Sequence, residues 1–129
     1  MKDLIKRLSY DKLFGMLTRN AIEIELEKLP TTFDCCIVDF NNMKKLNQIV
    51  GYEKVNQIMF KIFREFQESS NPLLVGRWFS GDEIIIVDKA IKCKIAELDK
   101  VSKKHGMTFK EHFYSQVRDI SELKEYEVD

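Results

Sequence analysis

The sequence contains few of the residues that mark disulfide frameworks and metal centres. Three cysteines and two histidines occur among 129 residues, and their spacing does not resemble a zinc site. Cys35 and Cys36 are adjacent on an expected strand, where their side chains point to opposite faces. We interpret the cysteines as small buried hydrophobic residues, and we expect no disulfide framework and a reducing, cytoplasmic location.

A surplus of either charge is also absent. The 21 lysines and arginines balance 21 acidic residues, so the formal net charge is zero at pH 7. Proteins that bind nucleic-acid backbone or anionic lipid normally carry a basic surplus, so we expect no DNA, RNA or membrane partner. The longest apolar runs, such as residues 84–87, are far shorter than the roughly 20 residues that span a bilayer. The first residues also lack the pattern of a signal peptide.

The sequence does contain enough apolar residues, 44%, to build a folded core. Its length predicts a single domain over residues 1–129, and no internal repeat or low-complexity stretch divides it. Residues 1–30 are expected to form a helical N-terminal extension within this domain. Thr18 is the expected N-cap of a helix over 19–29 that ends before Pro30.

Hydrophobic periodicity predicts the remaining elements. Apolar residues at three- and four-residue steps predict the helix over 53–68 most clearly, and alternating or β-branched segments predict the strands. The expected order is strand 33–40, a short helix through 50 capped by Asn41 or Asn42, helix 53–68, strands 73–79 and 83–88, helix 89–104, strand 107–117, and a last helical turn with Asp119 and Glu122 as capping box. This order predicts an α+β fold, a ferredoxin-like or palm βαββαβ sheet with helices on one face.

Three carboxylates are expected to meet at one edge of that sheet. In this topology the third strand lies antiparallel between the first two, so Asp39 at the end of the first strand lies near Asp82 and Glu83 at the start of the third. An all-oxygen cluster of this kind suits magnesium. Each residue alone also has an ordinary interpretation, because Asp82 and Glu83 fit a solvated turn and Asp39 fits a helix cap.

Three segments, in order, resemble the motifs of one family. Residues 11–19 (DKLFGMLTR) resemble the motif Asp-x-Leu-Thr-Gly-Leu-x-Asn-Arg, and residues 39–47 (DFNNMKKLN) resemble Asp-x-Asp-x-Phe-Lys-x-Ile-Asn. Residues 80–84 (SGDEI) resemble the GGDEF loop. The chain therefore resembles GGDEF domains and the related palm of CRISPR polymerases. Because it is short, it looks most like the stand-alone minimal CRISPR polymerases of bacterial antiphage defence.

The resemblance implies a metal-dependent catalytic site. Asp39 and Asp82 would hold Mg²⁺, or Mn²⁺ in its place, with the backbone carbonyl of Phe40 as an additional ligand. Glu83 would complete the metal site or help to deprotonate the attacking hydroxyl.

The resemblance also implies a nucleotide site. Lys44, in the first turn of the helix after Asp39, would contact a phosphate, and Ser80 and Gly81 would form the turn that a phosphate approaches. Asn47 and Asn56 match the two positions that contact the base. Basic residues that the family places later in the chain have no clear match here. By charge alone, the candidates are Lys100, Lys103 and Lys104.

Asn56 departs from diguanylate cyclases, which carry Asp at this position. A carboxylate accepts hydrogen bonds only, which suits the two donors of guanine, whereas an amide can pair with adenine as both donor and acceptor. We therefore expect ATP in preference to GTP, although an amide can also accept from guanine.

The expected activity is magnesium-dependent joining of ATP into a cyclic dinucleotide or short cyclic oligoadenylate, with cyclic di-AMP favoured. The product would be a signal in antiphage defence, read by a separate effector protein. Two bound nucleotides must face each other, which predicts a twofold homodimer. The alternatives are a diguanylate cyclase that uses GTP and an inactive GGDEF-like module that binds a cyclic nucleotide.

Overall fold

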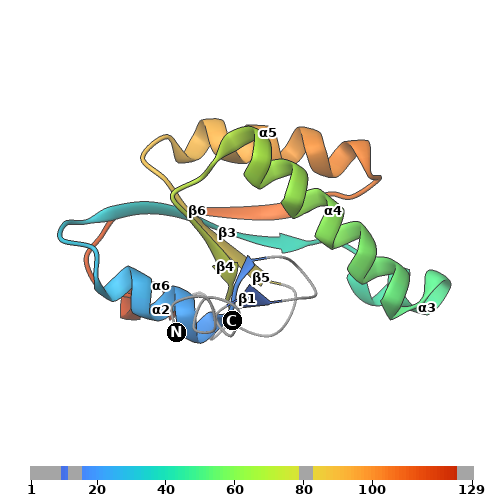
Figure 1. The fold of residues 1–129 in the computed structure, drawn as a ribbon, viewed down its shortest axis with the longest axis horizontal. Coiled ribbons are helices and arrows are strands. Elements are labelled where there is room, and N and C mark those ends of the chain that lie inside the picture. The colour runs from blue at the N-terminus through green and yellow to red at the C-terminus, as the bar shows by residue number, and fades with distance from the viewer. Residues whose placement is uncertain (1–9, 12–15, 79–82, 125–129) are drawn as a thin grey trace.

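The structure, a computed structural model, describes residues 10–11, 16–78 and 83–124. Within these ranges six strands form one sheet in the order β1-β2-β4-β5-β3-β6, and helices cover both of its faces (Figure 1). The elements are β1 (Tyr10–Asp11), β2 (Met16–Leu17), α2 (Arg19–Glu27), β3 (Phe33–Phe40), α3 (Met43–Val50), α4 (Tyr52–Ser70), β4 (Leu74–Arg77), β5 (Glu83–Val87), α5 (Ile91–Lys104), β6 (Phe109–Val117) and α6 (Ser121–Lys124).

The strand order confirms the expected topology. β5 pairs antiparallel with both β3 and β4, so it lies between them, and β6 pairs antiparallel with the other side of β3. The sequence β3-α3-α4-β4-β5-α5-β6 is the βαββαβ arrangement of a ferredoxin-like or palm sheet, with one additional short helix in the first crossover. The fold class predicted from the sequence is confirmed.

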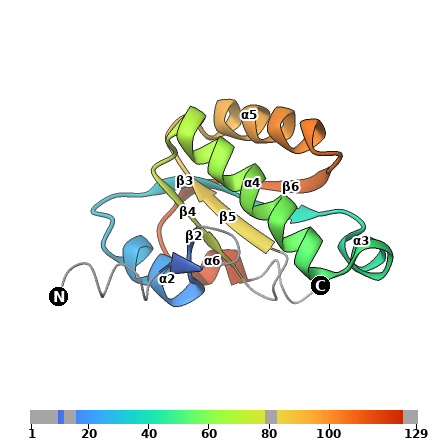
Figure 2. The same cartoon turned by 45° about the vertical axis from the view of Figure 1, so that its right-hand side comes forward.

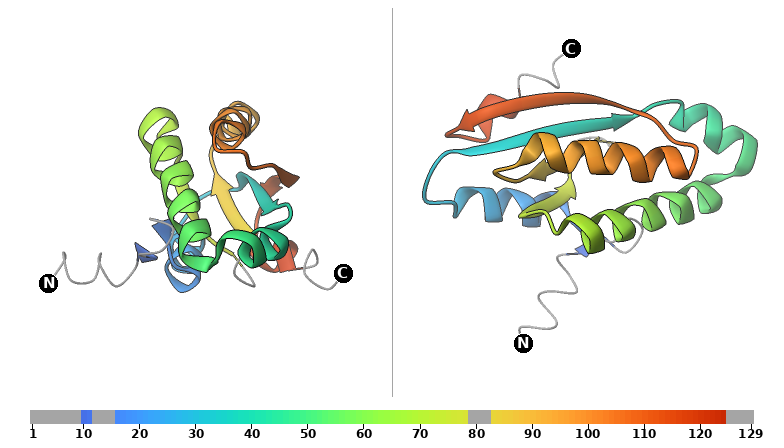
Figure 3. Two further views of the ribbon diagram at one scale, coloured as in Figure 1. Left: turned by 90° about the vertical axis from the view of Figure 1, so that its right-hand side faces the viewer. Right: turned by 90° about the horizontal axis from the view of Figure 1, so that it is seen from above.

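Helices α4 and α5 run side by side over one face of the sheet (Figure 3). Most of the apolar stripe of α4 is buried there, with Phe63 and Phe66 at 0% exposure. These rings pack over alternate residues of the central strands, including Val38 and Ile86. Burial of this continuous apolar layer supplies much of the favourable free energy of folding, because apolar area removed from water is the dominant stabilising term.

The opposite face carries a second core, which differs from the expected arrangement with helices on one face. Helix α2 and the short α6 pack there, and Ile22 and Leu26 of α2 meet Ile37 of β3 in one buried cluster (Figure 1). The approach is close at Gly76 of β4, where an added Cβ would lie 2.8 Å from the Cβ of Ile22. The described part of residues 1–30 therefore contributes to the folded core, with the strands β1 and β2 as well as a helix.

Local capping agrees with the sequence at one helix and differs at another. Thr18 accepts a hydrogen bond from the Ala21 N–H and caps α2, as predicted. Asn42 occupies the N-cap position of α3 with φ +61°, but its side chain makes no capping hydrogen bond, and the Asn41 side chain donates instead to Thr108 Oγ1 at 3.0 Å. The predicted N-cap position of Asn42 is therefore confirmed, but its side chain does not supply a capping hydrogen bond. Asn41 ties the end of β3 to the residues that lead into β6.

A capping box precedes α6, the last described helix. The Glu122 carboxylate accepts from the Asp119 N–H at 3.3 Å, as the sequence pattern predicts. None of the helices in the described ranges combines the length and the apolar character that crossing a bilayer requires.

Candidate functional site

Two of the predicted carboxylates are direct neighbours in the sheet. Asp39, the penultimate residue of β3, and Glu83, the first residue of β5, are paired across the antiparallel ladder. Residues directly opposite in such a ladder have Cβ atoms about 4.5–5.5 Å apart and point to the same face. The predicted meeting of Asp39 and Glu83 is therefore confirmed. Asp82, Ser80 and Gly81 lie outside the described residues.

The carboxylates belong to the face that α2 covers. Along β3, Cys35 and Ile37 point to this face and are buried, and Asp39 continues the same alternation. Along β5, Ile85 is buried on this face and Glu83 precedes it by two residues. Both carboxylates are half-buried, and Glu83 Oε2 is among the buried side-chain atoms. The apolar face thus changes to carboxylate side chains at one end of the sheet.

A lysine completes this row of side chains, and sequence reasoning missed it. Lys110 of β6 is paired with Asp39 on the side away from Glu83. The three residues therefore lie on one face across β5, β3 and β6. The charge of Lys110 was visible in the sequence, but its neighbour was not, because the register of β6 against β3 decides which face each residue takes.

Helices α3 and α4, which carry the predicted contact residues Lys44, Asn47 and Asn56, meet at a corner (Figure 2). Gly51, with φ +89°, forms the corner and donates its N–H to the Asn47 carbonyl at 2.9 Å. Lys44 is exposed in the first turn of α3, and Asn47 and Asn56 are half-buried on either side of the corner. Asn47 Oδ1 is buried and has no hydrogen-bond partner within the described ranges, so it can accept one from a ligand.

Phe40 anchors the end of β3. Its ring is 4% exposed and packs against Phe63 and Phe109, with ring centroids 5.8 Å and 5.4 Å away. The next residue, Asn41, donates its N–H to the Thr108 carbonyl at 2.9 Å. The backbone that follows Asp39 is therefore held by core packing on one face and by hydrogen bonding to the segment before β6.

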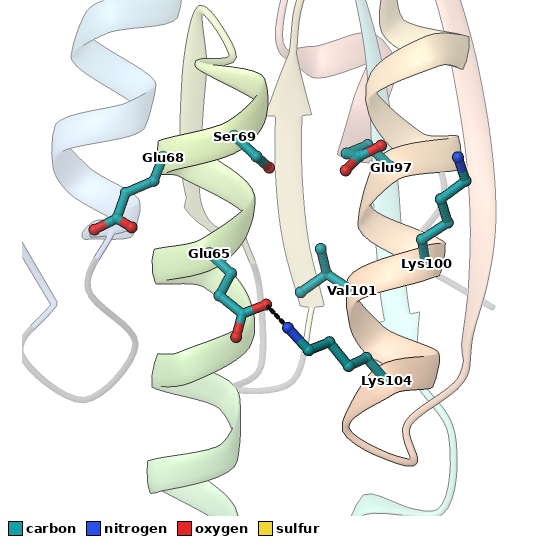
Figure 4. Close-up of a pocket in the computed structure, with 7 residues that line it drawn as sticks. All are labelled: Glu65, Glu68, Ser69, Glu97, Lys100, Val101 and Lys104. Atoms are coloured by element: carbon teal, nitrogen blue, oxygen red, sulfur yellow. Dashed lines mark hydrogen bonds and ion pairs between the residues drawn. The ribbon is translucent and has the colours of Figure 1, made fainter.

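The basic residues near the end of α5 lie in the other helical layer. Lys103 pairs with Asp99 at 3.0 Å, and Lys104 pairs with Glu65 of α4 at 3.3 Å (Figure 4). Together with Lys100, Lys104 lines a groove of about 550 Å³ between α4 and α5, on the face of the sheet opposite to that of Asp39. The sequence-based suggestion that these lysines serve the carboxylate site is therefore not supported by their positions.

Glu65 is the centre of a small charged network in that groove. A hydrogen bond from His105 Nε2 at 3.2 Å is the largest cause that lowers the pKa of the Glu65 carboxyl, and Lys104 adds to the effect.

Burial raises the pKas of the Cys35 and Cys36 thiols to about 12, so both stay protonated and act as apolar core residues, as expected.

The donor set at the carboxylate end fits a hard divalent cation. Asp39 and Glu83 offer only oxygen ligands from adjacent strands, which is the chemistry that Mg²⁺ and Mn²⁺ prefer. No group of three or more potential ligands from His, Cys, Asp and Glu occurs within residues 10–11, 16–78 and 83–124. A third carboxylate for this site, Asp82, would have to come from the segment between those ranges.

No protein-family model and no curated protein sequence matches the chain, but solved structures match its fold. The diguanylate cyclase SiaD of Pseudomonas aeruginosa, in complex with its activator SiaC, superposes with a TM-score of 0.76 at 16% identity over 97% of this chain. A microbial GGDEF domain with cyclic di-GMP gives a TM-score of 0.73 at 18% identity over 95% of this chain. The S helix-GGDEF-EAL portion of Vibrio cholerae LapD, bound to c-di-GMP, gives 0.77 at 15% over 95%.

This chain has the GGDEF-domain fold. It spans 58% of the SiaD chain, 87% of the microbial GGDEF domain and 33% of the LapD portion. In this GGDEF fold the ends of β3 and β5, where Asp39 and Glu83 pair, are the segments whose sequences resemble the family motifs. Sequence motifs and backbone geometry therefore point to the same end of the sheet.

Proposed function

We propose that this chain is a nucleotidyltransferase that joins ATP into a cyclic dinucleotide or short cyclic oligoadenylate, with cyclic di-AMP favoured. The observation that carries the proposal is the pairing of Asp39 with Glu83 at one end of a GGDEF-type sheet. Two carboxylates on neighbouring strands repel each other unless a cation lies between or beside them. A divalent ion at this place would also attract a nucleoside triphosphate.

The proposed metal ligands are Asp39, Asp82, Glu83 and the Phe40 carbonyl, with Mg²⁺ as the cofactor and Mn²⁺ as its substitute. When bound, such ions neutralise the phosphates and the pyrophosphate leaving group during in-line displacement. Glu83 also helps to take the proton of the attacking ribose hydroxyl. That hydroxyl attacks the α-phosphate of a second nucleotide, a phosphodiester bond forms and pyrophosphate leaves.

The remaining contacts come from the start of α3 and the α3–α4 corner. Lys44 and the N–H groups of the first turn of α3 bind phosphate oxygens, because both carry positive charge toward that end of the helix. Ser80 and Gly81 form the turn beside the phosphates. Because each reaction needs two nucleotides in facing sites, the active species is a twofold homodimer.

The adenine preference is assigned to Asn47 and Asn56. The buried Oδ1 of Asn47, which has no hydrogen-bond partner among the described residues, is an acceptor for a base donor, and Asn56 offers a donor and an acceptor together. Replacing Asn56 by Asp leaves acceptors only. The Asn56→Asp variant is therefore expected to shift the ratio of ATP to GTP consumption toward GTP by about tenfold, because one bidentate pair contributes about 1–3 kcal/mol of base discrimination. An unchanged ratio would remove Asn56 from the base site.

The biological role proposed is that of a minimal CRISPR polymerase, whose product is read by a separate effector protein in antiphage defence. A second candidate is a diguanylate cyclase using GTP, which the fold likeness to the diguanylate cyclase SiaD favours. A third is an inactive module that binds a cyclic nucleotide.

The purified chain, incubated with Mg²⁺ and each of the four nucleoside triphosphates, separates these candidates by mass spectrometry of the products. A cyclic adenylate supports the proposal, and cyclic di-GMP from GTP alone supports the second candidate. Absence of any cyclic product from folded, dimeric protein, together with binding of a cyclic dinucleotide by calorimetry, supports the third.

A further inference from the structure

Lys110 is the cationic member of a row of charges that crosses three strands. In the strand ladder, Glu83 of β5 lies opposite Asp39 of β3, and Asp39 lies opposite Lys110 of β6. Since neighbouring strands are about 4.8 Å apart, the three Cα positions span roughly 10 Å on one face of the sheet. Lys110 is thus the basic side chain that the ladder places directly beside a predicted metal ligand.

The ammonium group of Lys110 makes no ion pair with the residues that the structure describes. Lys110 is exposed and forms no ion pair in the described part of the protein, even with the adjacent Asp39. Two lysines of α5 behave differently, since Lys103 and Lys104 are paired with Asp99 and Glu65. An unpaired lysine on a four-carbon stem, one strand from a carboxylate, can reach an anion that binds over that carboxylate.

We propose that Lys110 is a phosphate-binding residue of this site, whose ammonium group contacts oxygens of the nucleotide triphosphate. The inference rests on the proposed function, because that function brings a polyphosphate to the Asp39–Glu83 end of the sheet. A lysine ammonium provides three hydrogen-bond donors and a full charge, which suits the non-bridging oxygens of a phosphate. Lys110 adds a contact from β6, on the side of Asp39 away from Glu83.

The test uses inorganic tripolyphosphate, which has neither base nor sugar, so it does not depend on the choice between ATP and GTP. Calorimetry in the presence of Mg²⁺ measures how tightly tripolyphosphate binds to the wild type and to the variants Lys110→Gln, Lys110→Arg and Lys61→Gln. Lys61 is an exposed lysine of α4 without an ion pair in the described ranges, so it controls for the loss of one charge. Thermal midpoints verify that every variant is folded.

We expect Lys110→Gln to weaken tripolyphosphate binding by about tenfold or more, because a hydrogen bond to a charged group is lost. Lys110→Arg should stay within about threefold of the wild type, since the charge remains, and Lys61→Gln should leave the affinity unchanged. The proposal is overturned if the wild type does not bind tripolyphosphate, or if Lys110→Gln and Lys61→Gln bind it equally.

A role for Lys110 in neutralising Asp39 gives a different pattern. Removing the lysine would then raise the affinity for Mn²⁺ measured without phosphate and would leave tripolyphosphate binding unchanged, which also overturns the proposal.

The proposed function can fail separately. If no triphosphate yields a cyclic product but Lys110→Gln still weakens tripolyphosphate binding, the phosphate contact stands and the cyclase activity does not.

Discussion

The two faces of the central sheet differ in how far their apolar surface extends. On the face under α4 and α5, β3 is apolar to its last residue, with Val38 and Phe40 buried. On the face under α2, the same strand is buried at Ile37 and then presents Asp39. Because side chains alternate along a strand, one face can complete the core while the other presents charged groups at the same position along the sheet.

The neighbouring strands repeat this division. On β5, Ile84 is fully buried on the α4 face while Glu83 lies on the α2 face. On β6, Phe109 packs against the α4-side core while Lys110 lies beside Asp39. Glu83, Asp39 and Lys110 thus lie on strands whose opposite face is buried under α4 and α5. We conclude that the α4 face mainly sets stability, whereas the charged end of the α2 face carries the proposed site.

The largest stability effect is expected on the α4 face. Phe66→Ala removes a ring with 0% exposure and should lower the free energy of unfolding by about 3–5 kcal/mol. Phe60→Ala is the matched control on the same helix, since Phe60 is 37% exposed and should cost less than about 1 kcal/mol. Urea unfolding followed by circular dichroism measures both. Equal losses would contradict the assignment of this face as the dominant core.

A smaller effect is expected where α2 packs on the sheet. Gly76→Ala places a Cβ 2.8 Å from the Ile22 Cβ, so the helix must shift, and we expect a loss of about 1–3 kcal/mol. The same denaturant titration, applied as a double-mutant cycle with Ile22→Ala, measures the coupling. Ile22→Ala should cost less in the Gly76→Ala background than in the wild type. Additive losses would show that α2 does not contact β4 at this position.

The smallest effect is expected on the outer surface of the helical layer. The pKa of Glu65 is lowered from its usual 4.5, chiefly by His105, so its ion pairs stabilise the fold above about pH 4.5 and are lost as the pH falls through the lowered pKa. Glu65→Gln should therefore lower the thermal midpoint at neutral pH by about 2 °C or less, and this difference should vanish in acid. A difference that stays constant with pH would contradict the ion-pair assignment.

The central topology and the Asp39–Glu83 pair could be predicted from the sequence. An antiparallel strand inserted between two parallel strands leaves little choice about which ends meet, and Glu83 begins its strand where Asp39 ends the other. The position of Lys110 could not be predicted. Its face depends on the register of β6 against β3, and a shift of one residue would move Lys110 to the other face.

The second core and the Asn41 contact were missed for a related reason, since both depend on distant partners. The apolar face of α2 was visible, but nothing local shows that Ile22 meets Gly76, 54 residues later. Asn41 follows a strand and precedes a helix, which is typical of a cap, yet its side chain bonds to Thr108, 67 residues away. Such tertiary contacts override local capping preferences.

The most direct test compares the two aspartates of β3. Asp39→Asn removes a proposed metal ligand, whereas Asp34→Asn removes the same charge at the other end of the strand and keeps the oxygen that accepts the Gln116 N–H at 2.9 Å. Both proteins and the wild type are incubated with Mg²⁺ and equimolar ATP and GTP, and the products are identified by mass spectrometry. We predict a cyclic adenylate from the wild type and from Asp34→Asn, and at least about 100-fold less from folded Asp39→Asn. Equal product from Asp39→Asn, or none from the folded wild type, would contradict the account.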